Sequence, residues 1–101
     1  MITYEVTAVV EPHLTEAYER YMRQDHIPDL LKTGCFVGAS IARAGAGRYR
    51  ISYEATTQSE LDRYLAMHAP RLRDDFARHF PSGVTLAREV WAAVERWGGP
   101  G

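Results

Sequence analysis

Hydrophobic and polar positions alternate with a period of two near the start of the chain, which is typical of a β-strand buried on one face. The apolar face of residues 2–10 is formed by Ile2, Tyr4, Val6, Ala8 and Val10, and Thr3, Glu5 and Thr7 lie opposite. Residues 48–55 alternate in the same way, with Tyr49, Ile51, Tyr53 and Ala55 opposite Arg48, Arg50, Ser52 and Glu54. Both stretches are therefore predicted to be amphipathic strands.

Two further strands are predicted at residues 35–44 and 84–94. In the first, one face carries Val37, Ala39 and Ile41, and the other carries Phe36, Gly38 and Ser40. In the last strand, the side chains expected to point inward are Leu86, Val90 and Trp91. The sequence Gly45-Ala46-Gly47 suits a tight hairpin turn, because glycine adopts the backbone conformations that such turns require.

Residues 14–31 show the spacing of an amphipathic helix. The inward positions are Leu14, Ala17, Tyr18, Tyr21 and Asp25, with Met22 and His26 beside them. Pro28 is expected to bend or end the last turn, because proline has no N–H to donate. Gly34 is expected to stop the helix as a C-terminal glycine.

A second helix is predicted to start at Thr57, which forms a capping box with Glu60. Its apolar stripe consists of Leu61, Tyr64, Leu65, His68, Leu72 and Phe76, so that His68 faces the core. Pro70 opposes helical geometry at Ala69, and we expect a break just after His68. Two interpretations stay open: the break opens a cavity beside His68, or Pro70 only separates two shorter helices.

The element order is strand, helix, strand, strand, helix, strand, which predicts an α+β ferredoxin-like plait. A four-stranded antiparallel sheet would then carry two helices on one face. A length of 101 residues, of which 46% are hydrophobic and 25% charged, fits one domain. We assign it to residues 1–97, followed by a flexible tail at 98–101. The charges on the polar sheet face are placed to pair with a second sheet, which predicts a homodimer.

Composition narrows the classes of partner. A net charge of −1 argues against the broad positive surface that nucleic-acid binding requires. No apolar run is long enough to span a membrane, and one cysteine, Cys35, forms no internal disulfide, so we predict a reducing, cytoplasmic location. No two histidines are three or four residues apart, which disfavours a metal site. Haem needs a single axial histidine, for which His68 would serve, but we favour a pocket without any cofactor.

His68 is the leading candidate for a general acid or base, because histidine is the side chain whose ordinary pKa lies nearest to neutral pH and an apolar pocket would hold it close to a ligand. Tyr64 precedes it by one helical turn and is positioned to orient it or to bind the same ligand. A core histidine whose nitrogens are both satisfied is the alternative. The residues predicted to bind substrate are Tyr18, Tyr21, Asp25, His26, Tyr49 and Tyr53.

Four stretches carry a resemblance that covers nearly the whole chain: ITYEVTAVV, HIPDLLKTGCFVGA, RYRISYEATTQSELDRYLAMHAP and the closing strand. Together they resemble the dimeric α/β-barrel superfamily, in its antibiotic-biosynthesis monooxygenase-like branch, and are most similar to its small uncharacterised members. The resemblance implies two subunits paired sheet to sheet into a barrel. It also implies a ligand cavity between the helices and the sheet of each subunit.

Three functions are consistent with these features. The first is a small cofactor-free enzyme that acts on an aromatic or polyketide-like molecule by acid/base chemistry, as a cyclase, isomerase, lyase or monooxygenase. The second is a noncatalytic protein that binds a small molecule in the same cavity. The third is a structural dimerisation module with a filled core. Fold alone does not choose among them.

Overall fold

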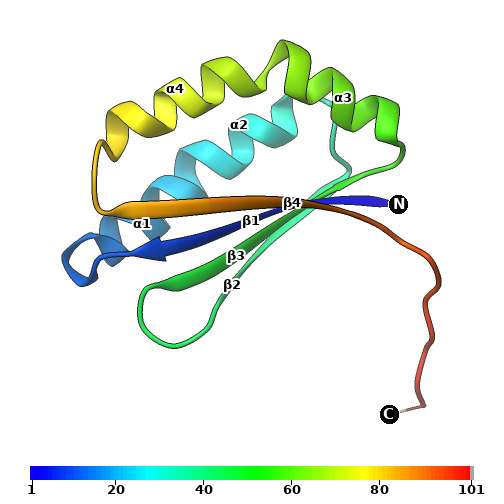
Figure 1. The fold of residues 1–101 in the computed structure, drawn as a ribbon, viewed down its shortest axis with the longest axis horizontal. Helices are drawn as coiled ribbons and strands as arrows, with labels where there is room; N and C mark the ends of the chain where they lie inside the picture. Colours follow the sequence, from blue (N-terminus) through cyan, green and yellow to red (C-terminus); the bar gives the residue numbers. More distant parts are fainter. Residues whose placement is uncertain (101) are drawn as a thin grey trace.

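The computed structural model describes residues 1–100 as one antiparallel sheet with helices packed on one of its faces (Figure 1). In chain order the elements are β1 (Ile2–Val10), η1 (Pro12–Leu14), α1 (Thr15–Tyr21), η2 (Met22–His26), α2 (Ile27–Lys32), β2 (Gly38–Arg43), β3 (Arg48–Ala55), α3 (Gln58–Met67), α4 (Ala69–His79) and β4 (Val84–Ala92). The strand order is β2-β3-β1-β4, with every neighbouring pair antiparallel. This arrangement confirms the predicted ferredoxin-like plait.

The inner face of the sheet carries the predicted apolar positions. Tyr4 lies opposite Tyr53 on β3 and opposite Val90 on β4, so the register places these side chains on the same face. The buried inner side chains of β1 and β3 are Tyr4, Ala8, Val10, Tyr49, Ile51, Tyr53 and Ala55. The alternation in the sequence was therefore sufficient to identify which face of these two strands meets the helices.

The first helical segment continues through Pro28, contrary to the prediction that proline would bend or end it. Before Pro28, the five residues of η2 form a π-helical turn, in which the N–H of Ile27 donates to the carbonyl of Met22. Pro28 then occupies the first turn of α2, where an N–H without a partner is usual. Gly34 follows the helix with φ of 76°, which agrees with its predicted role as a stop.

The second helical segment breaks at His68, as Pro70 predicted. His68 has φ of −122° and separates α3 from α4, in whose first turn Pro70 lies. Thr57 caps α3 by accepting a hydrogen bond from the N–H of Glu60 at 3.2 Å. The Glu60 carboxylate itself bonds Arg63 at 2.7 Å.

Two strand predictions need correction. β2 begins at Gly38 instead of residue 35, and before it Phe36 is buried while Val37 is 65% exposed, so Val37 does not share the half-buried environment of Ala39 and Ile41. The cause is that Phe36 turns toward the aromatic rings of Tyr53 and Tyr64, with centroids 5.4 and 4.9 Å away. Trp91 also does not point inward, because it lies on the outer sheet face, where its indole N–H donates to Glu5 at 2.9 Å.

Residues 93–100 form no helix or strand, and Figure 1 shows them leaving the end of β4 away from the sheet. The predicted tail at 98–101 falls in this segment, except for its last residue, which lies outside the described range. The assignment of residues 1–97 to one domain stays a prediction.

Candidate functional site: an aromatic cavity between the helices and the sheet

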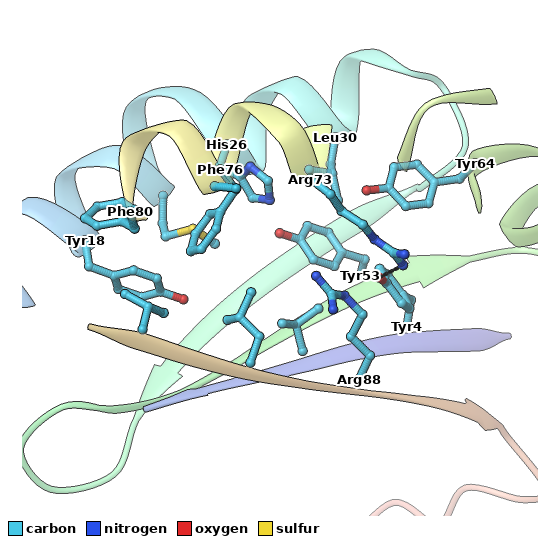
Figure 2. Close-up of a pocket in the computed structure, with 15 residues that line it drawn as sticks. Tyr4, Tyr18, His26, Leu30, Tyr53, Tyr64, Arg73, Phe76, Phe80 and Arg88 are labelled. Carbon is cyan, nitrogen blue, oxygen red and sulfur yellow. Dashed lines mark hydrogen bonds between the residues drawn. The ribbon is translucent and has the colours of Figure 1, made fainter. Parts of the chain in front are cut away.

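A cavity of about 260 Å³ lies between the helices and the inner face of the sheet. The cavity lies under α4. Its helical wall is formed by α1, η2 and α2, and its floor is formed by β1, β3 and β4 of the sheet (Figure 2). The aromatic residues that line it are Tyr4, Tyr18, Tyr53, Tyr64, Phe76 and Phe80. The remaining lining residues are Val6, Met22, His26, Leu30, Arg73, Ala77, Val84, Leu86 and Arg88.

The aromatic walls follow from strand register and helix spacing. Tyr4 and Tyr53 are direct partners across β1 and β3, with ring centroids 6.0 Å apart. Tyr64 reaches the same rings from α3, with its centroid 5.8 Å from that of Tyr4. At the other end, Tyr18 of α1 meets Phe76 of α4 edge to face at 6.2 Å. Such packed rings form rigid walls that suit a flat ligand.

His26 is brought to the cavity by the π-helical turn, of which it is the last residue. Its ring packs against Phe76 at a centroid distance of 5.5 Å. Its Nδ1 atom is buried and has no hydrogen-bond partner within residues 1–100. Burial lowers the pKa of His26 to about 4, more than the attraction of Asp29 raises it, so the imidazole is neutral at pH 7.

The hydroxyl of Tyr18 is the second polar group that faces the cavity without a partner in the described chain. The Tyr18 side chain is completely buried, and Figure 2 shows its hydroxyl directed into the cavity. Burial raises the pKa of this hydroxyl, which therefore stays protonated and available as a donor. Buried polar groups in proteins nearly always have partners, so His26 and Tyr18 together mark a place for a ligand or water.

Two arginines reach the opposite end of the cavity, near Tyr4 and Tyr64 (Figure 2). Arg73 of α4 donates to the hydroxyl of Tyr4 at 3.1 Å. Arg88 of β4 lies opposite Val6 of β1, which places it on the inner face of the sheet. The cavity therefore combines apolar walls with polar groups at both ends.

The structure brings together four of the predicted site residues, namely Tyr18, His26, Tyr53 and Tyr64. Tyr49 is buried, but its hydroxyl turns away to donate to Glu19 at 2.6 Å, which lowers the pKa of that carboxyl. Tyr21 and Asp25 lie outside the cavity, beside a shallow surface hollow that they share with His79.

His68 is not at the cavity, which corrects the prediction that it lines the pocket with Tyr64. Its half-buried ring lies at the junction of α3 and α4, stacked on the outer side of Tyr64 with centroids 6.5 Å apart. The helical stripe that placed His68 in the core assumed a continuous helix. Because the helix breaks at this residue, the stripe does not extend through it.

Sequence reasoning missed Arg73 and Arg88. For Arg88 a signal was present, since the inward alternation of β4 runs through Leu86, Arg88 and Val90 and includes one charged residue. Arg73 lies off the apolar stripe predicted for its helix and is exposed like Arg71 and Arg78, so nothing in its spacing distinguishes it from them. Its position is known only from the packing of α4 over Tyr4.

Residues 1–100 contain no group of three or more histidine, cysteine, aspartate or glutamate side chains arranged to hold a metal ion. Within the same residues, every helix is too short or too polar to cross a membrane.

Solved structures with the same fold match nearly the whole chain. A candidate antibiotic biosynthesis monooxygenase of Deinococcus radiodurans is 16% identical, with a TM-score of 0.69 and 100% of both chains covered. A second, from Nitrosomonas europaea, is 16% identical, with a TM-score of 0.64, covering 94% of this chain and 100% of the other. A dimeric ferredoxin-like protein from an uncultured marine organism is 14% identical, with a TM-score of 0.68, covering 95% and 97%. At these identities the likeness confirms the fold that the sequence resemblance implied.

Comparison of sequences, in contrast to comparison of folds, identifies a family. No curated protein matches the chain. A family described as "Domain of unknown function (DUF4286)" matches residues 1–94, which include every residue that lines the cavity. The chain therefore belongs to the DUF4286 family of ferredoxin-like proteins, similar in fold to the antibiotic biosynthesis monooxygenases.

Proposed function

We propose that this protein is a small cofactor-free enzyme that binds a flat, oxygen-bearing aromatic or polyketide-like molecule and acts on it by acid/base chemistry. The observation that carries the proposal is a pair of buried polar atoms, His26 Nδ1 and the Tyr18 hydroxyl, which have no partner within residues 1–100 and belong to side chains that line one aromatic cavity. Each atom leaves hydrogen-bonding capacity that an oxygen-bearing ligand would satisfy.

His26 takes the role of general base in this proposal, in place of His68. Its neutral imidazole accepts a proton from an acidic O–H or C–H of the ligand and becomes an imidazolium. Tyr18 donates a hydrogen bond to a ligand oxygen and stabilises the negative charge that proton removal leaves there. The imidazolium returns the proton to the same or another atom, which is the chemistry of an isomerase or a cyclase.

A noncatalytic binding protein is the second candidate, and one observation favours it. With a pKa of about 4, free His26 is a weak base, so it suits hydrogen bonding better than proton removal unless the ligand raises its pKa. In this case the same residues recognise the ligand without changing it. The names of the similar solved structures favour the enzyme, but only at the level of fold.

We also propose a homodimer formed by the outer faces of two sheets, as the sequence predicted. Glu5, at the centre of this face, forms an ion pair with Arg50 at 3.6 Å and accepts a hydrogen bond from the Trp91 indole at 2.9 Å, so it is paired within its own subunit and not left for a second sheet as predicted. Charges paired within one subunit are less costly to bury at an interface than unpaired ones. A similar solved structure is named as a dimeric ferredoxin-like protein, which supports the same assembly. For both candidate functions we keep the predicted cytoplasmic location.

Isothermal titration calorimetry with 2-naphthol and its hydroxylated analogues tests whether the cavity binds such ligands. We expect binding by the wild-type protein that weakens by about fivefold or more in Tyr18→Phe, which removes one hydrogen bond. Tyr49→Phe is the matched control, because it removes a hydroxyl that points away from the cavity. Equal binding by all three proteins would place the probes elsewhere and refute the proposed site. Turnover of a bound probe that is lost in His26→Gln separates the enzyme from the binding protein.

A further inference from the structure

Arg73 and Arg88 give the cavity a positive charge that nothing in its lining offsets. No aspartate or glutamate is among the lining residues, although the chain as a whole has a net charge of −1. The positive end of the cavity thus contrasts with the rest of the molecule. Such a local field in a low-dielectric cleft attracts an anion.

Neither guanidinium has a carboxylate partner within residues 1–100. The arginines that form ion pairs there are Arg20, Arg23, Arg43, Arg50, Arg63, Arg71 and Arg78. Arg73 bonds only the neutral hydroxyl of Tyr4, at 3.1 Å. Both groups therefore keep N–H donors that could form a charge-assisted hydrogen bond with a ligand.

The position of Arg88 is not required by the fold. It occupies an inward-facing site of β4 between Leu86 and Val90, where an apolar side chain would continue the alternation, and its own side chain lines the cavity while staying exposed to solvent. Burial lowers the pKa of His26 and raises that of Tyr64; the charge of Arg88 adds to the first shift and opposes the second, so it acts on groups from two different walls of the cavity. An arginine at such a site is better explained by what it binds than by packing.

We propose that the ligand is an aromatic carboxylic acid whose carboxylate is bound by Arg73 and Arg88. This rests on the proposed function and names the substrate class of the same cavity. The ring system lies between the tyrosine and phenylalanine side chains, a hydroxyl or keto oxygen at its far end reaches Tyr18, and His26 lies between the two ends (Figure 2). A volume of about 260 Å³ is small for a ligand site, which limits the ligand to one or two fused rings. Guanidinium groups suit a carboxylate because their planar donors match its two oxygens.

The test compares acids with their neutral amides. The probes are 6-hydroxy-2-naphthoate with 6-hydroxy-2-naphthamide, and 4-hydroxybenzoate with 4-hydroxybenzamide, titrated into the full chain by calorimetry. We expect each acid that binds to do so at least about tenfold more tightly than its amide. Arg88→Met and Arg73→Met should each reduce that preference several-fold, and the double variant should abolish it while amide binding changes less than about twofold. Arg71→Met, on the same helix but paired with Asp75 at 3.8 Å outside the cavity, should behave as wild type.

A measurement on the wild-type protein guards against variants that do not fold. Raising the salt concentration should weaken binding of the acid and leave binding of the amide unchanged, because only the acid forms an ion pair. Equal binding of acid and amide, or a preference for the acid that survives in the double variant, would show that the two arginines do not bind the carboxylate. The inference would then be wrong, while the proposed function would stand. If no probe of either size binds, the proposed function fails and the inference fails with it.

Discussion

Tyr18 and Tyr49 pack against each other with ring centroids 5.0 Å apart, yet their hydroxyls differ completely in hydrogen bonding. The Tyr49 hydroxyl donates to Glu19 at 2.6 Å, whereas the Tyr18 hydroxyl is buried beside the cavity with no partner in the described chain. Of these two tyrosines in contact, one has a hydroxyl that is hydrogen-bonded within the protein, and the other has a buried hydroxyl without a partner in residues 1–100.

This difference predicts opposite effects of removing the two hydroxyls. Tyr49→Phe should lower the free energy of unfolding by about 1 kcal/mol, because it removes a hydrogen bond to a charged group. Tyr18→Phe should leave stability unchanged or raise it by up to about 1 kcal/mol, because it removes a buried polar atom that bonds nothing. Urea unfolding of both variants beside the wild type measures this. A larger loss in Tyr18→Phe than in Tyr49→Phe would show that the Tyr18 hydroxyl has a partner after all.

His26 predicts a dependence of stability on pH. Its pKa is about 4 in the folded protein and 6.5 when unperturbed, so the unfolded chain binds more protons between these values. Stability should therefore be complete above about pH 6.5 and fall, by at most about 1.4 kcal/mol per pH unit, as the pH drops toward 4. The groups that act on the ring are Asp29 and Asp75, which oppose the shift, and Arg88, which adds to it.

The check is urea unfolding of wild type and His26→Gln across this pH range. In the variant, the free energy of unfolding should depend less steeply on pH, by the amount that the titration of one group contributes. His13→Gln is the matched control, because it makes the same substitution at an exposed histidine. The His13 ring lies 3.7 Å from the carboxylate of Glu11. Glu19, whose pKa is lowered chiefly by its hydrogen bond from Tyr49, contributes in the same direction in all three proteins. Identical slopes in wild type and His26→Gln would contradict a buried, neutral His26.

The fold could be predicted from the sequence because its strands alternate cleanly. The inner positions of β1 and β3 follow from period two, and the capping and proline signals identified both ends of α3. The exceptions have local causes. Phe36 is buried because it joins an aromatic cluster before β2 begins, which leaves no mark in the spacing of residues. Trp91 faces outward because it follows the inward-facing Val90 in a regular strand, so period two should have excluded it from the inner face.

The site could be predicted only in part. Tyr18, Tyr53 and Tyr64 lie on apolar faces and were found by periodicity. His26 was placed beside the helical stripe, and its actual position depends on a π-helical turn, which no residue pattern announces. Arg88 could have been found, because it interrupts an apolar alternation. The choice between His26 and His68 needed three-dimensional information, since both lie on or near an apolar stripe of a helix.

Two glycines of the hairpin between β2 and β3 should differ in their tolerance of substitution. Gly45 and Gly47 both have positive φ, of 66° and 78°. A side chain at Gly45 would meet nothing within 4 Å, whereas a Cβ at Gly47 would collide with the carbonyl oxygen of Val10. Gly47→Ala should therefore destabilise the protein by roughly 1–2 kcal/mol more than Gly45→Ala, which carries only the backbone strain. Thermal melting of the two variants measures the difference, and equal melting temperatures would refute the close approach.

The proposed homodimer predicts that a charge on the outer sheet face abolishes assembly. Thr7 is exposed near the middle of β1 and lies opposite Arg50 on β3 and Ala87 on β4. In a sheet-to-sheet dimer, Thr7→Lys would bury a second cation beside Arg50, whose carboxylate partner Glu5 is already paired, and this costs several kcal/mol. Wild type should sediment as two chains at micromolar concentration, and Thr7→Lys as one. Ala66→Lys, an equal change at an exposed site on α3, should remain dimeric because it lies on the helical side. A wild-type protein that stays monomeric over the whole concentration range would show that this interface does not form. Dissociation of both variants would show that the interface involves the helical side.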